Sequence, residues 1–251
     1  MNSVTASLLV FVCAFGSALL GMLLRRVLPE HHVSPESKDV IRICMGLVAS
    51  TVALVLGLLV YSAKGFYDTQ TSEVTQLAAN VLLLDRVLAR YGPESGEARA
   101  ELRSGINHQM ELLWPEQGSR NAKLNAIPAG GETVVDKIHE LSPKDDRQRS
   151  LKSQALNLAL QSGETRLLMY TQRNVPVPRL LLVILVFWLI ALFISFGLFA
   201  PVNYTVVVSL LIAAAAASGA IFLMIEMYYP YGGLIQVSSA PLRAVVEQLG
   251  R

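Results

Sequence analysis

The 251-residue chain has little charge. Asp, Glu, Lys and Arg make up 16% of it, and 53% of its residues are hydrophobic. A soluble domain has about 25% charged residues. This deficit, together with long apolar runs, indicates an integral membrane protein.

Neither the net charge nor the two cysteines point to a further class of partner. The formal net charge is only +2, so there is no general basic field that would attract nucleic acid. Cys13 and Cys44 both lie inside apolar runs. Cysteines in such positions are usually small hydrophobic residues. They predict no disulfide framework and do not decide the compartment.

The chain also lacks the signatures of catalysis. It has no phosphate loop, nucleophile elbow or metalloprotease helix. His31 and His32 lie in a polar loop, where solvated side chains are a better reading than a metal site. The apolar runs contain essentially no ionisable residues, which usually mark transport or chemistry in a membrane. We therefore predict no enzyme, no cofactor, no metal and no proton-coupled transporter.

Four apolar runs have the length of about 20 residues that a bilayer core requires. The first has no Lys or Arg before it and no clear cleavage site, so it does not read as a signal peptide. We expect transmembrane helices at Thr5–Leu24, Ile43–Ala63, Leu180–Ala200 and Val202–Ile225.

These spans are arranged as two pairs with a polar insertion between them. Pro201 separates the third and fourth spans and predicts a tight helical hairpin. We expect an all-α membrane protein divided into spans 1 and 2 (residues 1–63), an extramembrane helical bundle (64–178), spans 3 and 4 (179–225) and a C-terminal tail (226–251).

The insertion has helical periodicity and no alternating strand pattern. Its first stretch has apolar residues three or four apart, at Val74, Leu77, Val81, Leu84 and Leu88. Gly92 and Pro93 end that stretch, and Pro93 could open the next helix. Residues 115–132 are rich in Gly, Pro and Asn and predict a loop. The bundle is too small to resemble an enzyme domain with a deep pocket.

The tail carries tyrosines and then a short amphipathic pattern. Tyr228, Tyr229 and Tyr231 suit the boundary between water and lipid. Ser239 is a plausible N-cap, with Pro241 in the first turn. The apolar face of the predicted helix consists of Leu242, Val245, Val246 and Leu249.

The second span has polar and small residues inside it and continues straight into a polar sequence. Ser50, Leu54 and Leu58 are four residues apart and share one helix face. Such a stripe suits an apolar constriction that gates by dewetting, or leucines facing lipid or the core. Lys64 follows, either at a pore mouth or as a snorkelling lysine. On the fourth span, Ala215 and Gly219 suit close packing within or between subunits.

Charge does not determine the orientation in the membrane. Lys and Arg residues near the span ends are almost equally numerous on both sides. Four spans would place both termini on the same side as the insertion.

Several stretches resemble the bacterial bestrophin-like membrane family. They are LPEHHVSPESKDVIR, LVLGLLVYSAKGFYDTQ, LAANVLLLDRVLARYGPE and PYGGLIQVSSAPLR. The segment LVLGLLV is also similar to the apolar neck segment of the second helix in bestrophin channels. The resemblance implies neck positions at Ser50, Leu54 and Leu58. Bestrophin necks use bulky apolar or aromatic residues there, whereas this chain has a hydroxyl at the first position, so bestrophin gating and selectivity do not transfer.

The resemblance also has consequences for topology and partners. It favours a bacterial inner-membrane protein whose insertion and termini are cytoplasmic, and it implies a homo-oligomer around a central axis, with a pentamer as the analogue. Its partners would be membrane lipid, copies of itself and permeating ions. The acidic cluster that binds calcium in bestrophins is reduced here to Glu226, so we expect no calcium site.

Two functions follow from these observations. The first is an ion channel or channel-like pore lined by the second span, with Leu54 and Leu58 at the constriction and Lys64 at the mouth. The alternative is a non-conducting membrane scaffold or envelope-stress partner that acts through its helical bundle.

Overall fold

A computed structural model describes residues 3–25, 27, 35–114, 132–172 and 178–249. Every regular element in these ranges is a helix, and they contain no strand. The chain divides into two compact units, each built from separate stretches of sequence. Unit 1 comprises Met1–Phe66 and Pro176–Tyr228, and unit 2 comprises Tyr67–Val175 and Tyr229–Arg251.

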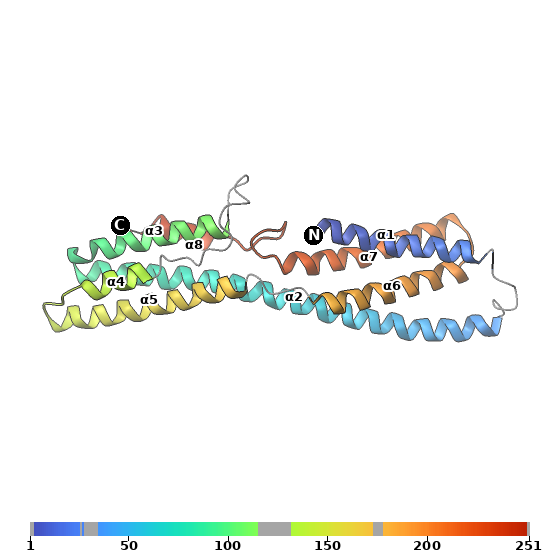
Figure 1. Ribbon diagram of the computed structural model, residues 1–251, viewed down its shortest axis with the longest axis horizontal. Coiled ribbons are helices and arrows are strands. Elements are labelled where there is room, and N and C mark those ends of the chain that lie inside the picture. Colours follow the sequence, from blue (N-terminus) through green and yellow to red (C-terminus); the bar gives the residue numbers. More distant parts are fainter. Residues whose placement is uncertain (1–2, 26, 28–34, 115–131, 173–177, 250–251) are drawn as a thin grey trace. The chain divides into compact units, whose positions relative to one another are not determined.

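Unit 1 contains the apolar helices. Helix α1 (Ser3–Leu24), helix α6 (Arg179–Phe199) and helix α7 (Tyr204–Met227) lie beside the first part of helix α2 (Pro35–Tyr91) (Figure 1). Within the described ranges, four helices are long and apolar enough to cross a membrane. Helix α2 begins at Pro35, before the predicted start of the second span at Ile43, and proline is favourable at a helix start.

A close approach of two backbones joins α1 to α6. A Cβ atom added to Gly21 would lie 2.2 Å from the Ile194 carbonyl oxygen, and one added to Gly197 would lie 2.0 Å from the Ala18 carbonyl oxygen. Only glycine fits at both positions, which is the way small residues let membrane helices pack tightly. At the end of the same helix pair, the Arg25 guanidinium donates to the Ala200 carbonyl at 2.5 Å.

The predicted break at Pro201 is confirmed. Ala200 has extended backbone angles of φ −80° and ψ 143°, as the residue before proline favours. Helix α7 then begins at Tyr204, and its N-cap residue Asn203 is also extended. Figure 1 shows α7 running back in the direction opposite to α6, so the chain reverses between Phe199 and Tyr204.

Unit 2 is a helical bundle. It contains the rest of α2, a short 3-10 helix η2 (Pro93–Ser95), and helices α3 (Gly96–Leu113), α4 (Glu132–Glu140), α5 (Asp146–Gln172) and α8 (Ala240–Val246). Of the predicted loop at 115–132, all but the last residue lie outside the described residues, and Glu132 begins α4. Pro93 opens η2, and α3 begins after it.

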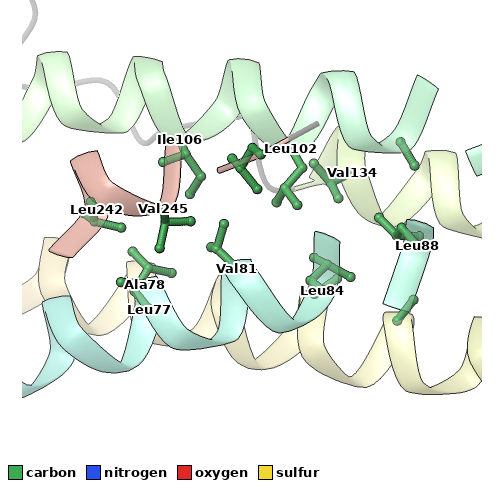
Figure 2. Close-up of a cluster of buried hydrophobic side chains, with 14 of the residues drawn as sticks. Leu77, Ala78, Val81, Leu84, Leu88, Leu102, Ile106, Val134, Leu242 and Val245 are labelled. Carbon is green, nitrogen blue, oxygen red and sulfur yellow. The ribbon is translucent and has the colours of Figure 1, made fainter. Parts of the chain in front are cut away.

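The core of unit 2 is built from the periodic leucines and valines. Figure 2 shows Leu77, Val81 and Leu84 of α2 facing Leu102 and Ile106 of α3, and the labelled residues of the tail lie in the same cluster. Three of the four predicted apolar residues are on helix α8, where Leu242 and Val245 are buried and Val246 packs against the core, whereas Leu249 is buried after the end of the helix.

Two details of the tail differ from expectation. Tyr228 and Tyr231 are buried, so only Tyr229 has the exposure expected of a tyrosine at the lipid boundary. Ser239 makes no side-chain capping bond. Instead, the Ser238 hydroxyl accepts a hydrogen bond from the Ala240 amide at 3.2 Å.

The end of α2 is closed by polar contacts. Gly92 has φ +132°, which favours glycine and ends the helix. The buried Ser95 hydroxyl donates to the Leu88 carbonyl at 2.6 Å. One turn earlier, the Arg99 guanidinium donates to both carboxylate oxygens of Asp85, at 2.7 and 3.1 Å. These contacts fasten the start of α3 to the end of α2.

Candidate pore-lining face of helix α2

One face of α2 within unit 1 is left uncovered by the rest of the chain. Its exposed apolar residues are seven apart, at Val40, Leu47, Leu54 and Tyr61. A second row, also seven apart, contains Ile43, Ser50, Gly57 and Lys64, and all four are exposed. Rows with a spacing of seven stay on one side of a helix, so the two rows define a single surface, which we call the α2 stripe.

The other side of α2 holds the helix in place. Val52, Leu59 and Ala63 are buried in a cluster shared with α1, α6 and α7. Only 11% of the most apolar segment of α2 is buried, compared with 33% for α1. Helix α2 is thus the apolar helix with the most surface remaining to be covered.

Two of the predicted constriction residues, Ser50 and Leu54, belong to this stripe, and Leu58 lies beside it, four residues after Leu54. Leu54 is 64% exposed and Leu58 is 59% exposed. Ser50 is also exposed, and its hydroxyl donates to the Gly46 carbonyl at 3.0 Å. The Thr51 hydroxyl donates to the Leu47 carbonyl at the same distance. Both hydroxyls satisfy their donors within the helix and keep oxygen lone pairs for other groups.

The character of the exposed face changes after Tyr61. Lys64 and Asp68 are exposed, and Thr71, Ser72, Thr75 and Gln76 follow on α2. A helix of 57 residues is about 85 Å long, whereas the bilayer core is about 30 Å thick. The polar part of α2, from Lys64 onward, therefore lies outside the apolar segment that would cross a bilayer.

Contacts near the end of α7 fix the last turns of α2 in unit 1. The Tyr228 ring stacks on Phe66, with ring centroids 5.6 Å apart, and its hydroxyl lies 3.4 Å from the Ser62 hydroxyl. The Ser3 hydroxyl at the start of α1 donates to the buried carboxylate of Glu226. The Tyr228 contacts anchor α2 just after Tyr61, and the bond between Ser3 and Glu226 joins the start of α1 to the end of α7.

The part of the chain that the structure describes holds no group of three or more His, Cys, Asp or Glu residues that could bind a metal ion. His31 and His32 lie outside the described residues. Asp145 has the ordinary role of an acidic residue at a helix start, since its carboxylate accepts a hydrogen bond from the Gln148 amide at 2.6 Å.

Sequence reasoning identified the middle of the stripe but missed its ends. Val40, Leu47 and Tyr61 extend the surface of Leu54 by one or two heptads on either side. The seven-residue spacing was visible in the sequence. The spacing of four residues indicates Ser50, Leu54 and Leu58, but it does not include the longer rows.

A protein-family model matches most of the chain. The family model described as the bestrophin-like domain matches residues 11–242. The chain therefore belongs to the bestrophin-like family. A search of curated proteins found no match.

Solved structures share the fold. A crystal structure of a bacterial bestrophin homologue from Klebsiella pneumoniae, a tryptophan-to-alanine variant, is similar to this chain with a TM-score of 0.73 and 13% sequence identity, and the match covers 99% of this chain and 97% of the other. An isoleucine-to-threonine variant of the same protein gives a TM-score of 0.71 at 12% identity, covering 96% and 97%. At such identities the likeness establishes the bestrophin-like fold alone.

Proposed function

We propose that the protein is an oligomeric membrane channel whose α2 stripe lines the ion path, with Leu54 and Leu58 at an apolar constriction. The observation that carries this proposal is the long exposed stripe on α2, the least covered of the apolar helices. Copies arranged around an axis would turn these stripes toward one another and remove their apolar surface from lipid.

The second row of the stripe, from Ile43 to Lys64, contains polar positions that suit a water-filled path better than contact with lipid. Ser50 offers hydroxyl oxygens, and a Cβ at Gly57 would meet no atom within 4 Å, so the backbone is accessible there. Lys64 ends the row at the change to polar sequence. Leu54 and Leu58 lie between the polar positions, where a ring of apolar side chains would gate by dewetting.

The arrangement in the membrane is part of the proposal. Residues 1–63 and 179–225 would form four spans in two hairpin-like pairs, residues 64–178 the extramembrane bundle, and 226–251 the tail. We place the bundle and both termini in the cytoplasm of a bacterial cell, with the spans in the inner membrane and a pentamer as the assembly. None of the described contacts favours the alternative of a non-conducting scaffold.

Shortening the constriction leucines tests the proposal. Leu54→Ala/Leu58→Ala removes two apolar side chains per subunit, so the path widens and wets more readily. We expect single-channel recording of the purified protein in planar bilayers to show a larger unitary conductance than the wild type. The matched control is Leu8→Ala/Leu20→Ala, which shortens two exposed leucines of α1. The proposal fails if wild-type and Leu54→Ala/Leu58→Ala currents are equal.

A further inference from the structure

Four polar side chains of unit 2 form a closed set of hydrogen bonds, which we call the amide latch. The Tyr231 hydroxyl donates to Gln70 Oε1 at 2.8 Å. Gln70 Nε2 donates to Gln172 Oε1 at 2.7 Å and to Glu73 Oε2 at 3.1 Å. Gln172 Nε2 donates to Glu73 Oε1 at 3.0 Å. Each carboxylate oxygen of Glu73 thus accepts one amide hydrogen bond.

The latch joins three separate parts of the chain. Gln70 and Glu73 belong to α2, Gln172 is the last residue of α5, and Tyr231 lies in the tail that follows α7. Two further bonds hold the same tail segment, because Trp114 Nε1 donates to the Val237 carbonyl at 2.8 Å and the Tyr67 hydroxyl donates to the Gln236 carbonyl at 3.1 Å. The Trp114 ring also meets Tyr231 edge-on, with centroids 5.4 Å apart.

The carboxyl group in the latch is buried beside neutral partners. Gln70 is fully buried and Glu73 is 9% exposed. Burial raises the pKa of the Glu73 carboxyl above its ordinary value of 4.5, and the hydrogen bonds from Gln172 and Gln70 offset only part of this rise. Without a cation to compensate, a buried carboxylate strongly disfavours its charged form.

Among the described residues, no cation forms an ion pair with Glu73. On α5, the described cation nearest to Gln172 in the sequence is Arg166, whose Nε donates to the Ser162 carbonyl at 3.4 Å. The tail presents the Tyr231 hydroxyl, which donates to Gln70 rather than to the carboxylate. On α2 itself, Asp68 is exposed and lies more than a turn before Glu73.

From this geometry we propose that the amide latch is a proton-sensitive device that holds the tail and the end of α5 against α2 while Glu73 is protonated, and loosens when Glu73 ionises. Opening the latch hydrates the carboxylate and removes the cost of burying its charge. The device acts on the fold of unit 2 and does not depend on whether the protein conducts.

The raised pKa of Glu73 determines how the stability of the closed latch depends on pH. A carboxyl group that holds its proton more tightly in the closed latch stabilises that state fully below its ordinary pKa of 4.5. The stabilisation is lost as the pH rises through the raised pKa. Between the two values, opening releases one proton and increases by up to about tenfold per pH unit.

Hydrogen–deuterium exchange of the full chain in lipid nanodiscs, from pH 4 to pH 8, measures this opening. We expect the protection factors of the tail segment 231–237, corrected for intrinsic exchange, to fall as the pH rises. Glu73→Gln has no proton to lose at this position and should abolish the fall. Glu164→Gln, which changes an exposed carboxylate of α5, should leave it unchanged.

A second variant keeps the test decisive if Glu73→Gln fails to fold. Tyr231→Phe retains the carboxyl group but removes the bond between the tail and Gln70. The pH dependence should then disappear from segment 231–237 and persist at the end of α5. Protection of the tail that does not depend on pH in the wild type would overturn the proposal. So would a pH dependence that remains in Glu73→Gln, or one that remains in the tail of Tyr231→Phe.

Discussion

Replacing Gly21 by alanine is expected to destabilise the protein by about 3 kcal/mol, at the upper end of the usual cost of overpacking. The added Cβ would lie 2.2 Å from the Ile194 carbonyl oxygen. That atom belongs to the backbone of α6, so no side-chain rotation can relieve the contact, and the two helices must separate. A loss of this size lowers the unfolding midpoint of a 150–250-residue protein by about 6–12 °C.

Gly197, at the same crossing, and Gly16, away from it, provide a second test position and a control. Gly197→Ala should cost a similar amount, because its Cβ would meet the Ala18 carbonyl oxygen of α1. Gly16→Ala changes a glycine of the same helix α1 that has no atom within 4 Å, and it should leave the midpoint unchanged or raise it. Thermal unfolding in detergent compares the three variants. Equal midpoints for Gly21→Ala and Gly16→Ala would show that α1 and α6 do not cross there.

Removing the carboxylate of Asp85 is expected to destabilise unit 2 by about 3 kcal/mol, at the lower end of the range for a broken buried ion pair. The Asp85 side chain is 2% exposed, and its partner Arg99 is 22% exposed. Asp85→Ala leaves the guanidinium with no acceptor for its two hydrogen bonds at the junction of α2 and α3. Because Arg99 is partly exposed, water can solvate its guanidinium, and this limits the loss of stability caused by Asp85→Ala.

An exposed pair in the same bundle is the control. Asp146 and Arg149 form an ion pair at the start of α5, and both side chains are largely exposed. Asp146→Ala should change stability by less than about 1 kcal/mol. Chemical denaturation followed by the fluorescence of Trp114, in a Trp188→Phe background, monitors unit 2. Equal midpoints for Asp85→Ala and Asp146→Ala would show that the buried pair stabilises unit 2 no more than the exposed pair does.

The helices were predictable because their local signals are strong. The apolar runs gave α1, α6 and α7 to within a few residues, and Pro201 located the turn between α6 and α7. The apolar periodicity from Val74 to Leu88 continued the second span without a break, and α2 is indeed one helix through Tyr91.

The contacts between distant helices were not predictable from local patterns. The small-residue surface of α7 suggested Gly219 as a packing position within or between subunits. A Cβ there would meet no atom of this chain within 4 Å, so Gly219 makes no close approach within the subunit, and packing between subunits stays a prediction. The close approach uses Gly21 and Gly197 instead, each of which is a single glycine in an ordinary apolar sequence. Pairing of this kind depends on which helix faces which, and periodicity within one helix does not contain that information.

The latch was missed for a similar reason. The sequence placed Tyr231 at the lipid boundary, and no local pattern distinguished Gln70, Glu73 or Gln172. Their hydrogen bonds join positions about 100 and 160 residues apart in the chain. The candidate pore residues, in contrast, belong to one helix, so spacing alone was enough to place Ser50, Leu54 and Leu58 on a common face.

The central claim is that the α2 stripe lines an ion path, and cysteine modification during single-channel recording tests it most directly. The native cysteines are first replaced, as Cys13→Ala/Cys44→Ala, and Leu54→Cys is added. A charged methanethiosulfonate reagent should then change the unitary current of Leu54→Cys and leave that of Leu8→Cys on α1 unchanged. An unaltered current after complete modification of Leu54→Cys, verified by mass spectrometry, or no current from folded oligomeric protein, would contradict the account.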